Sequence, residues 1–417
     1  MNTFSIVFLL VLALATLMRL WLGWRHIGHI QAHRTAVPGG FADRIGLDAH
    51  QRAADYTCAK TRLNAIAVVF DAAVLLIFTF GGGLQAVDHI AASFFDGDIA
   101  RGITFVALLM IIMSVIELPF DLYRTFVIEQ RFGFNKMTIA MFFGDLAKHA
   151  AIGAVLVLPL LFAVLWLMGK MGGMWWLYVW LVAVGFMIFV QFIAPTVIAP
   201  LFNKFTPMQE GEMKKRIESL IARCGFTSKG LFVMDGSKRS SHGNAYFTGF
   251  GKSKRIVFFD TLLSRLNPSE VEAVLAHELG HFRRRHVLKS LILSAVFTLA
   301  FLFLLGNLKD LPWFYQGLNV AFPATDAMAL TLFFLVMPTF TFLLQPLLSM
   351  YSRRHEFEAD QYAAQNADAH ELVSALVKLY KDNASTLTPD PVHSAFYDSH
   401  PPAPIRIARL QQAAAAT

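Results

Sequence analysis

Residues Asn267 to Leu305 read NPSEVEAVLAHELGHFRRRHVLKSLILSAVFTLAFLFLL, a helix start, an H-E-x-x-H motif and a long apolar run in succession. Asn267-Pro268-Ser269-Glu270 predicts the helix start, because Asn is a good cap, Pro suits the first helical position and Glu follows three residues after the cap. The apolar run that begins at Val287 has the length of a membrane span. The stretch therefore predicts a helix that carries the motif, followed directly by a membrane helix.

The motif itself, His277-Glu278-Leu279-Gly280-His281, has the spacing of a zinc site. Four residues make about one helical turn, so His277 and His281 share one face and can bind a single zinc ion. Glu278 lies about 100° further round the helix, where its carboxylate can take a proton from a water on the metal. Zinc lowers the pKa of such a water towards about 7, so the motif predicts metal-assisted hydrolysis of a peptide bond. The alternative is a solvated helix that carries two His and a Glu without a metal.

The composition is that of a membrane protein. Of the 417 residues, 56% are hydrophobic and 16% are charged, whereas soluble domains carry about 25% charged residues. The apolar residues gather in seven runs near the length of a membrane span, about 20 residues each. The predicted spans are Phe4–Trp21, Leu63–Gly83, Ile103–Tyr123, Ala150–Met168, Trp175–Ile198, Val287–Leu305 and Ala327–Met350. A very apolar soluble core is the alternative, but such a core does not need uninterrupted runs.

Basic residues alternate between successive loops. The loops after the first, third and fifth runs and the tail after the seventh are rich in Lys and Arg, whereas the other loops are nearly free of them. The positive-inside rule then places the N-terminus outside, and the C-terminus and the H-E-x-x-H helix in the cytoplasm. Because the net charge of +7 comes mostly from residues beside the spans, membrane lipids and not nucleic acid are the predicted partners.

Two His ligands leave zinc short of a protein ligand, and the candidate follows the seventh run. If Arg353–Asp360 is helical, Glu356 and Asp360 share a face, while Glu358 points nearly away. Glu356 would complete a His₂Glu site, and Asp360 could accept a hydrogen bond from a ligand imidazole and fix its tautomer. His355 is a weaker candidate ligand. The alternative is an exposed helix in which these acids only pair with the neighbouring arginines.

Two further stretches carry candidate functional residues. Ser240–Phe247 and Ile256–Phe259 are predicted strands joined by a turn around Gly249–Gly251, and an exposed strand beside a protease site can bind an extended peptide by strand addition. Asn244 could hold the substrate backbone there, although an ordinary hairpin is the alternative. In the stretch before a predicted C-terminal helix, His400 and Arg406 are donors that could stabilise an oxyanion, unless the segment is only a polar surface turn.

With these residues assembled, the chain closely resembles the CAAX prenyl protease 1 family of membrane zinc metalloendopeptidases, which are gluzincins. The resemblance also rests on Phe126-Val127-Ile128-Glu129, Gly133-Phe134-Asn135, Asp235–Phe247, Lys254–Val257, Asp260–Leu263, Glu356–Asp360 and Ser399-His400-Pro401-Pro402. It implies a mainly α, polytopic membrane protein with seven transmembrane helices around a water-filled chamber. A small cytoplasmic α+β gluzincin-like metalloprotease region completes the expected fold.

The resemblance also implies a role for each site residue. The implied set is one Zn²⁺ per chain held by His277, His281 and Glu356; Asp360 beside the ligands; catalytic Glu278, His400 and Arg406; and substrate-binding Asn244 and Ala245. The expected organisation is transmembrane helices one to five in residues 1–198, a catalytic region with the hairpin and the motif in 199–286, helices six and seven in 287–350, and a C-terminal cytoplasmic region in 351–417.

The predicted function is cleavage near the C-terminus of a peptide or protein that is prenylated or membrane-associated. The chain is short for the family and has a compact last external loop, which resembles a bacterial member and predicts a multi-pass protein of the bacterial inner membrane. This feature leaves the prenylation of the substrate open, since bacteria generally lack protein prenylation. The alternatives are a quality-control protease of broad specificity and, in another class, a transporter or scaffold with a structural zinc. The sequence leaves the oligomeric state open.

Overall fold

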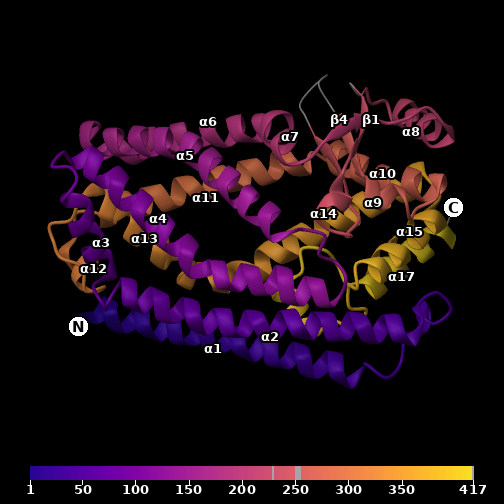
Figure 1. The fold of residues 1–417 in the computed structure, drawn as a ribbon, viewed down its shortest axis with the longest axis horizontal. Helices are drawn as coiled ribbons and strands as arrows, with labels where there is room; N and C mark the ends of the chain where they lie inside the picture. Colours follow the sequence, from indigo (N-terminus) through magenta and orange to yellow (C-terminus); the bar gives the residue numbers. More distant parts are fainter. Residues whose placement is uncertain (228–229, 249–254, 416–417) are drawn as a thin grey trace.

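A computed structural model describes residues 1–227, 230–248 and 255–415 of the chain. The molecule is an elongated bundle of long helices with a smaller mixed region at one end (Figure 1). Within the described residues, seven helices are long and apolar enough to cross a membrane, which confirms the predicted fold class. These seven contain α1 (Thr3–Ala32), α2 (Leu47–Phe78), α4 (Asp98–Tyr123), α5 (Ile139–Lys170), α6 (Trp175–Ile193), α11 (His286–Leu308) and α13 (Asp326–Thr341). The third, fifth and seventh continue without a break into neighbouring segments and cover Asp98–Glu129, Gly172–Phe202 and Asp326–Asn366.

Each predicted apolar run coincides with one of these helices, and the differences lie at the ends. The second run was expected to continue to Gly83, but α2 ends at Phe78 because a turn of three glycines follows, with Gly82 at φ +77°. At its other end, α2 begins at Leu47, well before the predicted Leu63. Hydropathy finds the apolar part of a helix, and this helix extends beyond that part into a charged segment.

The membrane helices pack around a core of large apolar side chains. Phe8 of α1, Phe105 of α4 and Phe333 of α13 are fully or almost fully buried in this core. Many other apolar side chains on the same helices are exposed, for example Leu10 and Ile111, at 65% and 61%. A helix that is apolar on all sides is typical of a membrane span, because lipid covers the face that the core does not.

The remaining elements connect these helices or follow them. The helices are α3 (Gly83–Ala92), α7 (Ala199–Phe202), α8 (Glu212–Arg223), α9 (Asp260–Leu263), α10 (Pro268–Arg283), α12 (Pro312–Gln316), α14 (Gln345–Asn366), α15 (Ala369–Asp382), α16 (Pro391–Tyr397) and α17 (Ala403–Ala415). The 3₁₀ and π segments are η1 (Gly39–Phe41), η2 (Arg124–Glu129), η3 (Gly172–Met174), η4 (Ala194–Ile198), η5 (Gly236–Lys238) and η6 (Phe342–Leu344).

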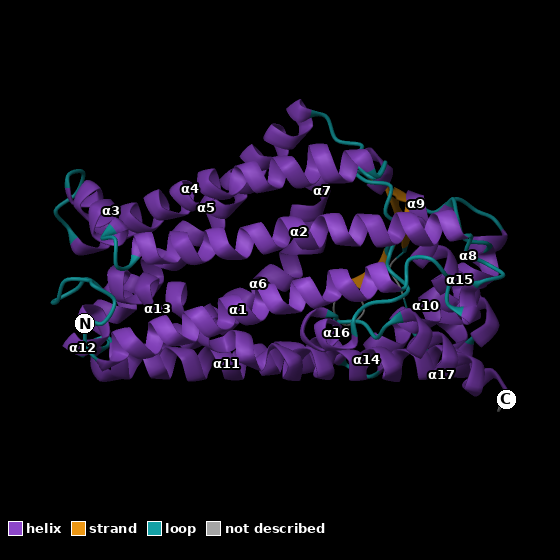
Figure 2. Cartoon of the chain, turned by 90° about the horizontal axis from the view of Figure 1, so that it is seen from below, coloured by secondary structure: helices purple, strands orange, loops and turns teal. Residues whose placement is uncertain are grey.

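The two ends of the bundle differ in content. The N-terminus, α3 and α12 lie at one end, and the strands, α8, α10, α15 and α17 lie at the other, together with the C-terminus (Figures 1 and 2). Seven crossings put the two termini at opposite ends. The described helices are therefore arranged so that the H-E-x-x-H motif and the C-terminal region share one end.

A four-stranded sheet lies at the end that carries the motif. Its strands are β1 (Phe205–Pro207), β2 (Leu231–Met234), β3 (Ala245–Thr248) and β4 (Arg255–Phe259), in the order β1-β2-β4-β3. The β2–β4 pair is parallel and the other two pairs are antiparallel. The expected hairpin is confirmed as the antiparallel pair β3–β4, but β3 begins at Ala245 and not at Ser240, and the turn predicted around Gly249–Gly251 lies outside the described residues.

A second apolar core lies beneath this sheet. Ile256 and Phe258 of β4 are buried in the same apolar cluster as Val271 and Leu275 of α10. Helical spacing puts Val271 and Leu275 on one face of α10, whereas β4 is an inner strand of the sheet and is buried at three successive residues, Ile256 to Phe258. This packing fixes the motif helix to the sheet.

The motif helix α10 also packs closely on α14. A Cβ at Gly280 would lie only 2.9 Å from Cα of Ala359, so the glycine in the motif permits a close approach of the two backbones. The helix α14 continues the seventh membrane helix through η6, and the predicted helix over Arg353–Asp360 is confirmed. The crossing of α10 and α14 brings the motif beside Glu356 and Asp360, which are buried.

Candidate active site

The start of α10 is fixed by the residues that predicted it. The Asn267 side chain accepts a hydrogen bond from Glu270 N, and the Glu270 carboxylate accepts one from Asn267 N, both at 2.8 Å. This capping box confirms the expected helix start. Glu270 is buried and also accepts hydrogen bonds from Ser374 and Lys378 of α15, each at 2.7 Å. The helix is thereby held in a defined position before it reaches the motif.

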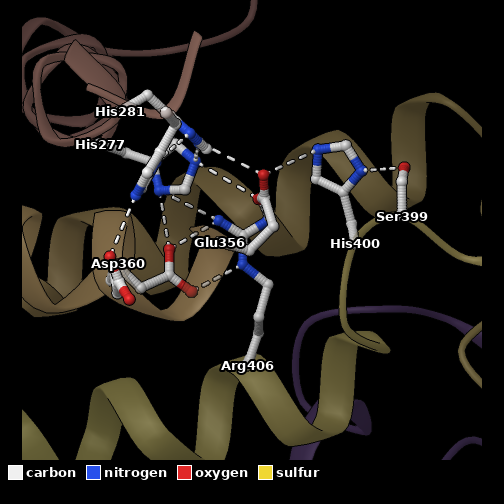
Figure 3. Close-up of polar contacts among 9 residues, drawn as sticks. His277, His281, Glu356, Asp360, Ser399, His400 and Arg406 are labelled. Carbon is white, nitrogen blue, oxygen red and sulfur yellow. Dashed lines mark hydrogen bonds and ion pairs between the residues drawn. The ribbon is translucent and has the colours of Figure 1, made fainter. Parts of the chain in front are cut away.

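Three side chains with metal-binding atoms meet where α10 crosses α14 (Figure 3). The Nε2 atoms of His277 and His281 lie 3.1 Å apart. The carboxylate of Glu356 lies 3.5 Å from Nε2 of His277 and 3.3 Å from Nε2 of His281. One ligand atom from each of the three residues lies within 4.8 Å of the others. The three residues predicted as zinc ligands are thus brought together.

The spacing and hydrogen bonding of this cluster fit a cation. Zinc bonds of about 2.0–2.1 Å in a tetrahedral site put neighbouring ligand atoms roughly 3.4 Å apart, close to the distances between these three side chains. Oε2 of Glu356 is buried and has no hydrogen-bond partner within the described residues. Because a buried polar atom costs free energy when it is unsatisfied, a cation between the three groups would account for it.

Asp360 and Arg406 lie behind the first His of the motif. The Asp360 carboxylate lies 2.9 Å from Nδ1 of His277, the atom that faces away from the cluster. Arg406 of α17 donates two hydrogen bonds to the same carboxylate, at 2.8 and 2.6 Å, and both side chains are buried. The predicted contact between Asp360 and a ligand imidazole is therefore present. The guanidinium of Arg406, predicted as a donor that could stabilise an oxyanion, also lies 3.6 Å from the Glu356 carboxylate.

The electrostatics of the cluster favour positive charge. Burial lowers the pKa of the His277 imidazole, but hydrogen bonds to Asp360 and Glu356 outweigh burial and raise it to about 9. Burial also raises the pKa of the Glu278 carboxyl, which the neighbouring His277 and His281 partly oppose. A carboxyl group with a raised pKa beside a candidate metal site is suited to accept and return a proton.

Asn244 and Ala245 lie at the start of β3, which is an edge strand of the sheet. The Asn244 side chain accepts a hydrogen bond from Ala245 N at 2.8 Å, and the Asn244 carbonyl accepts one from Phe259 N of β4. Within the described residues, no strand pairs with the other side of β3. The strand that was predicted to bind substrate therefore has an edge available for strand addition.

A network that the sequence analysis did not identify holds the base of this strand. Nδ1 of His242 lies 3.2 Å from the Asn383 side-chain oxygen, and Nε2 of His242 lies 3.5 Å from the carboxylate of Glu129. Tyr56 of α2 donates to the same carboxylate at 2.5 Å. These contacts link the strand to α2 and to η2. The only sequence signal was the presence of Glu129 and His242 in stretches shared with the resembled family.

His400 lies on the opposite side of the ligand cluster from Asp360 (Figure 3). Its Nε2 lies 3.5 Å from the Glu356 carboxylate, its Nδ1 lies 3.0 Å from the Ser399 hydroxyl, and its side chain is 61% exposed. His400 and Asn244 both line a cavity of about 1230 Å³. The same cavity is lined by Arg19 and Asp71 of the membrane helices, so it extends from the cluster into the bundle.

Comparisons with known proteins agree with this fold and this cluster. Residues 26–204 match the CAAX prenyl protease N-terminal family of five membrane helices, and residues 207–414 match peptidase family M48. The chain is 34% identical to CAAX prenyl protease 1 of Saccharomyces cerevisiae, over 90% of this chain and 88% of that protein. It is also 34% identical to the CAAX prenyl protease 1 homolog of Homo sapiens, over 75% of this chain and 74% of that protein.

A solved structure extends the likeness to three dimensions. The crystal structure of Saccharomyces mikatae Ste24p matches with a TM-score of 0.92 at 30% identity, over 98% of this chain and 99% of that chain. The fold and the buried cluster together define a multi-pass membrane metallopeptidase. Within that class, the chain belongs to the CAAX prenyl protease 1 family of peptidase family M48.

Proposed function

We propose that the metal is zinc, one ion per chain, held by His277, His281 and Glu356. The observation that carries this proposal is the buried cluster of two imidazole nitrogens and a carboxylate at tetrahedral spacing, in which one carboxylate oxygen of Glu356 has no hydrogen bond within the described residues. Two His nitrogens and one carboxylate are the donor set of many catalytic zinc sites, which keep a fourth position open.

The residues around this cluster divide the catalytic work. Zinc bound there would supply a Lewis acid and lower the pKa of water. Glu278 takes a proton from the attacking water and returns it to the leaving amine, a role that its raised pKa supports. His400 is placed at the cavity wall beside Glu356, where it can donate to the substrate carbonyl oxygen as negative charge develops. Asp360 holds the His277 ring in the tautomer that leaves Nε2 free for the metal.

The proposed substrate is a flexible C-terminal peptide that enters the cavity and pairs with β3. Strand addition at Asn244 and Ala245 orients the backbone and makes few demands on side chains. A cavity that extends among the membrane helices can admit an extended segment, and access between helices disfavours folded domains. The named relatives are CAAX prenyl proteases, which supports a prenylated or membrane-associated substrate for this chain as well.

The proposed orientation has the N-terminus outside and the catalytic end in the cytoplasm, and the proposed location is the bacterial inner membrane. The alternation of Lys and Arg between loops supports the orientation. Reporter fusions after Thr417 and within Asp88–Asp98 would test it, since they should lie on opposite sides of the membrane. Reporters on the same side would contradict the seven-span arrangement.

A cleavage assay with four matched substrates tests the proposed specificity. These are a prenylated C-terminal peptide, the same peptide without the prenyl group, a misfolded membrane protein and a compact soluble domain without a loose tail. The flexible peptides should be cut and the compact domain should not, with Glu278→Gln as the inactive control. Equal cleavage of the peptides and the compact domain would contradict the enclosed site, and preference for the misfolded protein would favour quality control.

A further inference from the structure

His286 lies directly behind the second His of the motif. Its Nδ1 is 3.0 Å from Nδ1 of His281, and its Nε2 is 3.1 Å from the Glu358 carboxylate of α14. The side chain of His286 is only 4% exposed. A continuous line of contacts therefore runs from His281 through His286 to Glu358, although the helical pattern of α14 alone had predicted that Glu358 points away from the cluster.

The local backbone explains how His286 reaches this position. The helix α10 ends at Arg283 and α11 begins at His286, so two residues join them. The second, Arg285, is in the left-handed region at φ 57° and ψ 37°, a conformation that residues with a Cβ seldom adopt. This turn brings the first residue of α11 back against the last turn of α10.

The proton positions along this line follow from the metal site. If Nε2 of His281 binds the metal, a neutral imidazole carries its proton on Nδ1 and donates it towards His286. Nδ1 of His286 must then accept, so the proton of a neutral His286 lies on Nε2. That N–H points at a carboxylate oxygen of Glu358, which can only accept when ionised. The hydrogen-bonding role of each nitrogen and oxygen is then fixed, and every donor along the line faces an acceptor.

Glu358 is itself held in place by cations. Arg354 donates to the Glu358 carboxylate at 3.2 Å, and the Lys289 ammonium lies 3.8 Å away. Both favour the ionised carboxylate that the line of hydrogen bonds requires. Arg354 binds the Oε1 oxygen of Glu358, and Lys289 lies near the same Oε2 oxygen as His286.

We propose that His286 and Glu358 form a positioning pair that fixes the tautomer and orientation of His281. The inference rests on the proposed zinc site and adds the counterpart of Asp360: one motif His is held directly by a carboxylate, and the other through an intervening imidazole. Hydrogen bonds from ligand imidazoles to such partners raise metal affinity, and their loss typically costs about 10–100-fold.

Packing is the competing explanation, because the His286 ring stacks on His355 with centroids 4.0 Å apart. Four variants separate ring packing from hydrogen bonding. His286→Phe keeps a ring against His355 and removes both hydrogen bonds. His286→Asn keeps an acceptor near the position of Nδ1. Glu358→Gln keeps the shape of the side chain and removes its charge, and His355→Phe changes the stacking partner without touching the hydrogen-bond line.

The experiment measures the zinc affinity of the full-length purified variants by competition with a chelator, together with their thermal unfolding. His286→Phe should lose about 10–100-fold in affinity, His286→Asn and Glu358→Gln should lose less, and His355→Phe should bind like wild type. Affinity of wild-type strength in His286→Phe, or an equal loss in His355→Phe, would overturn the positioning role. If His286→Phe does not fold, an undiminished affinity in both His286→Asn and Glu358→Gln overturns it instead.

The outcome also separates this inference from the proposed zinc site. If His277→Ala binds zinc as tightly as wild type, the ligand assignment fails. If His277→Ala loses zinc while His286→Phe keeps it, the ligand assignment stands and the positioning pair is rejected.

Discussion

The two sides of the ligand cluster differ in how their polar groups are satisfied. We call the buried side behind the His ligands the inner side and define it by Asp360, Arg406, His286 and Glu358; the exposed side is the cavity side, defined by Asn244 and His400. Arg406 reaches the cavity wall as well, but its side chain is buried and its guanidinium is paired with Asp360. On the inner side, Asp360 and Arg406 are buried and joined by two hydrogen bonds of 2.8 and 2.6 Å. On the cavity side, the His400 side chain is 61% exposed, and its contact with Glu356 is 3.5 Å.

We expect this difference to separate groups that hold the proposed metal site from groups that meet the substrate. Removing one partner of a buried ion pair destabilises a folded protein by about 3–5 kcal/mol. The contacts of the inner side are therefore costly to rearrange. A group that contacts substrate must exchange its partners during each turnover, and an exposed group can do so at little cost. Substitutions on the two sides should therefore have different readouts, with metal and stability on one side and turnover on the other.

The largest effect should come from the ligands between the two sides. His277→Ala combined with His281→Ala removes two of the three proposed ligands, so the chain should lose its metal and all cleavage. The membrane core is a separate apolar cluster, so the helical bundle should persist. Metal analysis and circular dichroism of the purified variant would check both points. Full retention of zinc would refute the site.

Glu278→Gln should reduce turnover by about 10²–10⁴-fold, the range for loss of a general base. The amide keeps the shape of the side chain but cannot take up the proton. Since Glu278 is not among the three proposed ligands, zinc content should match that of wild type. Wild-type turnover in this variant would contradict the mechanism, and loss of zinc would move Glu278 to the metal-holding group.

Much of this arrangement could be predicted from local sequence patterns. Seven apolar runs predicted the membrane helices, and Asn267 with Glu270 predicted the start of α10 through a capping box that the structure contains. These signals depend on residues within one helix. Glu356 and Asp360 were placed together for the same reason, because one helical turn separates them.

The contacts that sequence patterns did not predict join separate elements. The position of His286 depends on the left-handed turn at Arg285, and helical spacing along α14 gave no sign that another helix would supply a partner for Glu358. The same holds for Arg406. The sequence shows that it is a hydrogen-bond donor, but its pairing with Asp360 depends on how α17 packs on α14. Long-range packing decided which face of the cluster each side chain occupies.

His400→Ala tests the cavity side in the comparison of the two sides of the ligand cluster. Loss of one donor to a developing oxyanion typically lowers kcat by about 10²–10³-fold. Because His400 is exposed and makes only a distant contact with Glu356, zinc affinity and thermal stability should change little. Steady-state kinetics and metal titration of the same preparation would show whether the two properties separate. A parallel loss of zinc would place His400 with the inner side.

Arg406→Met should show the opposite pattern. The substitution keeps much of the side-chain volume but leaves the buried Asp360 carboxylate without its bidentate partner. Stability should fall by about 3–5 kcal/mol, and zinc affinity by about 10–100-fold through the weakened support of His277. Thermal unfolding and chelator competition would measure the two effects. If only kcat fell, with zinc and stability unchanged, Arg406 would belong to the cavity side, as its donor character first suggested.

Asn244→Ala should have the smallest effect and the most selective one. Asn244 directly precedes the edge strand β3, and its side-chain oxygen accepts a hydrogen bond from Ala245 N. One hydrogen bond contributes about 0.5–1.5 kcal/mol, so kcat/KM for an extended peptide should fall by about 3- to 10-fold.

The matched measurement uses the same peptide with the backbone amide nearest the cut methylated, which weakens strand addition in the substrate instead. If β3 binds the peptide as a strand, the methylated peptide should already be a poor substrate, and Asn244→Ala should reduce its cleavage less than it reduces cleavage of the parent. Independent, multiplicative losses would show that Asn244 and strand pairing act at different places, and a loss of zinc would show that this residue supports the metal site and not the substrate.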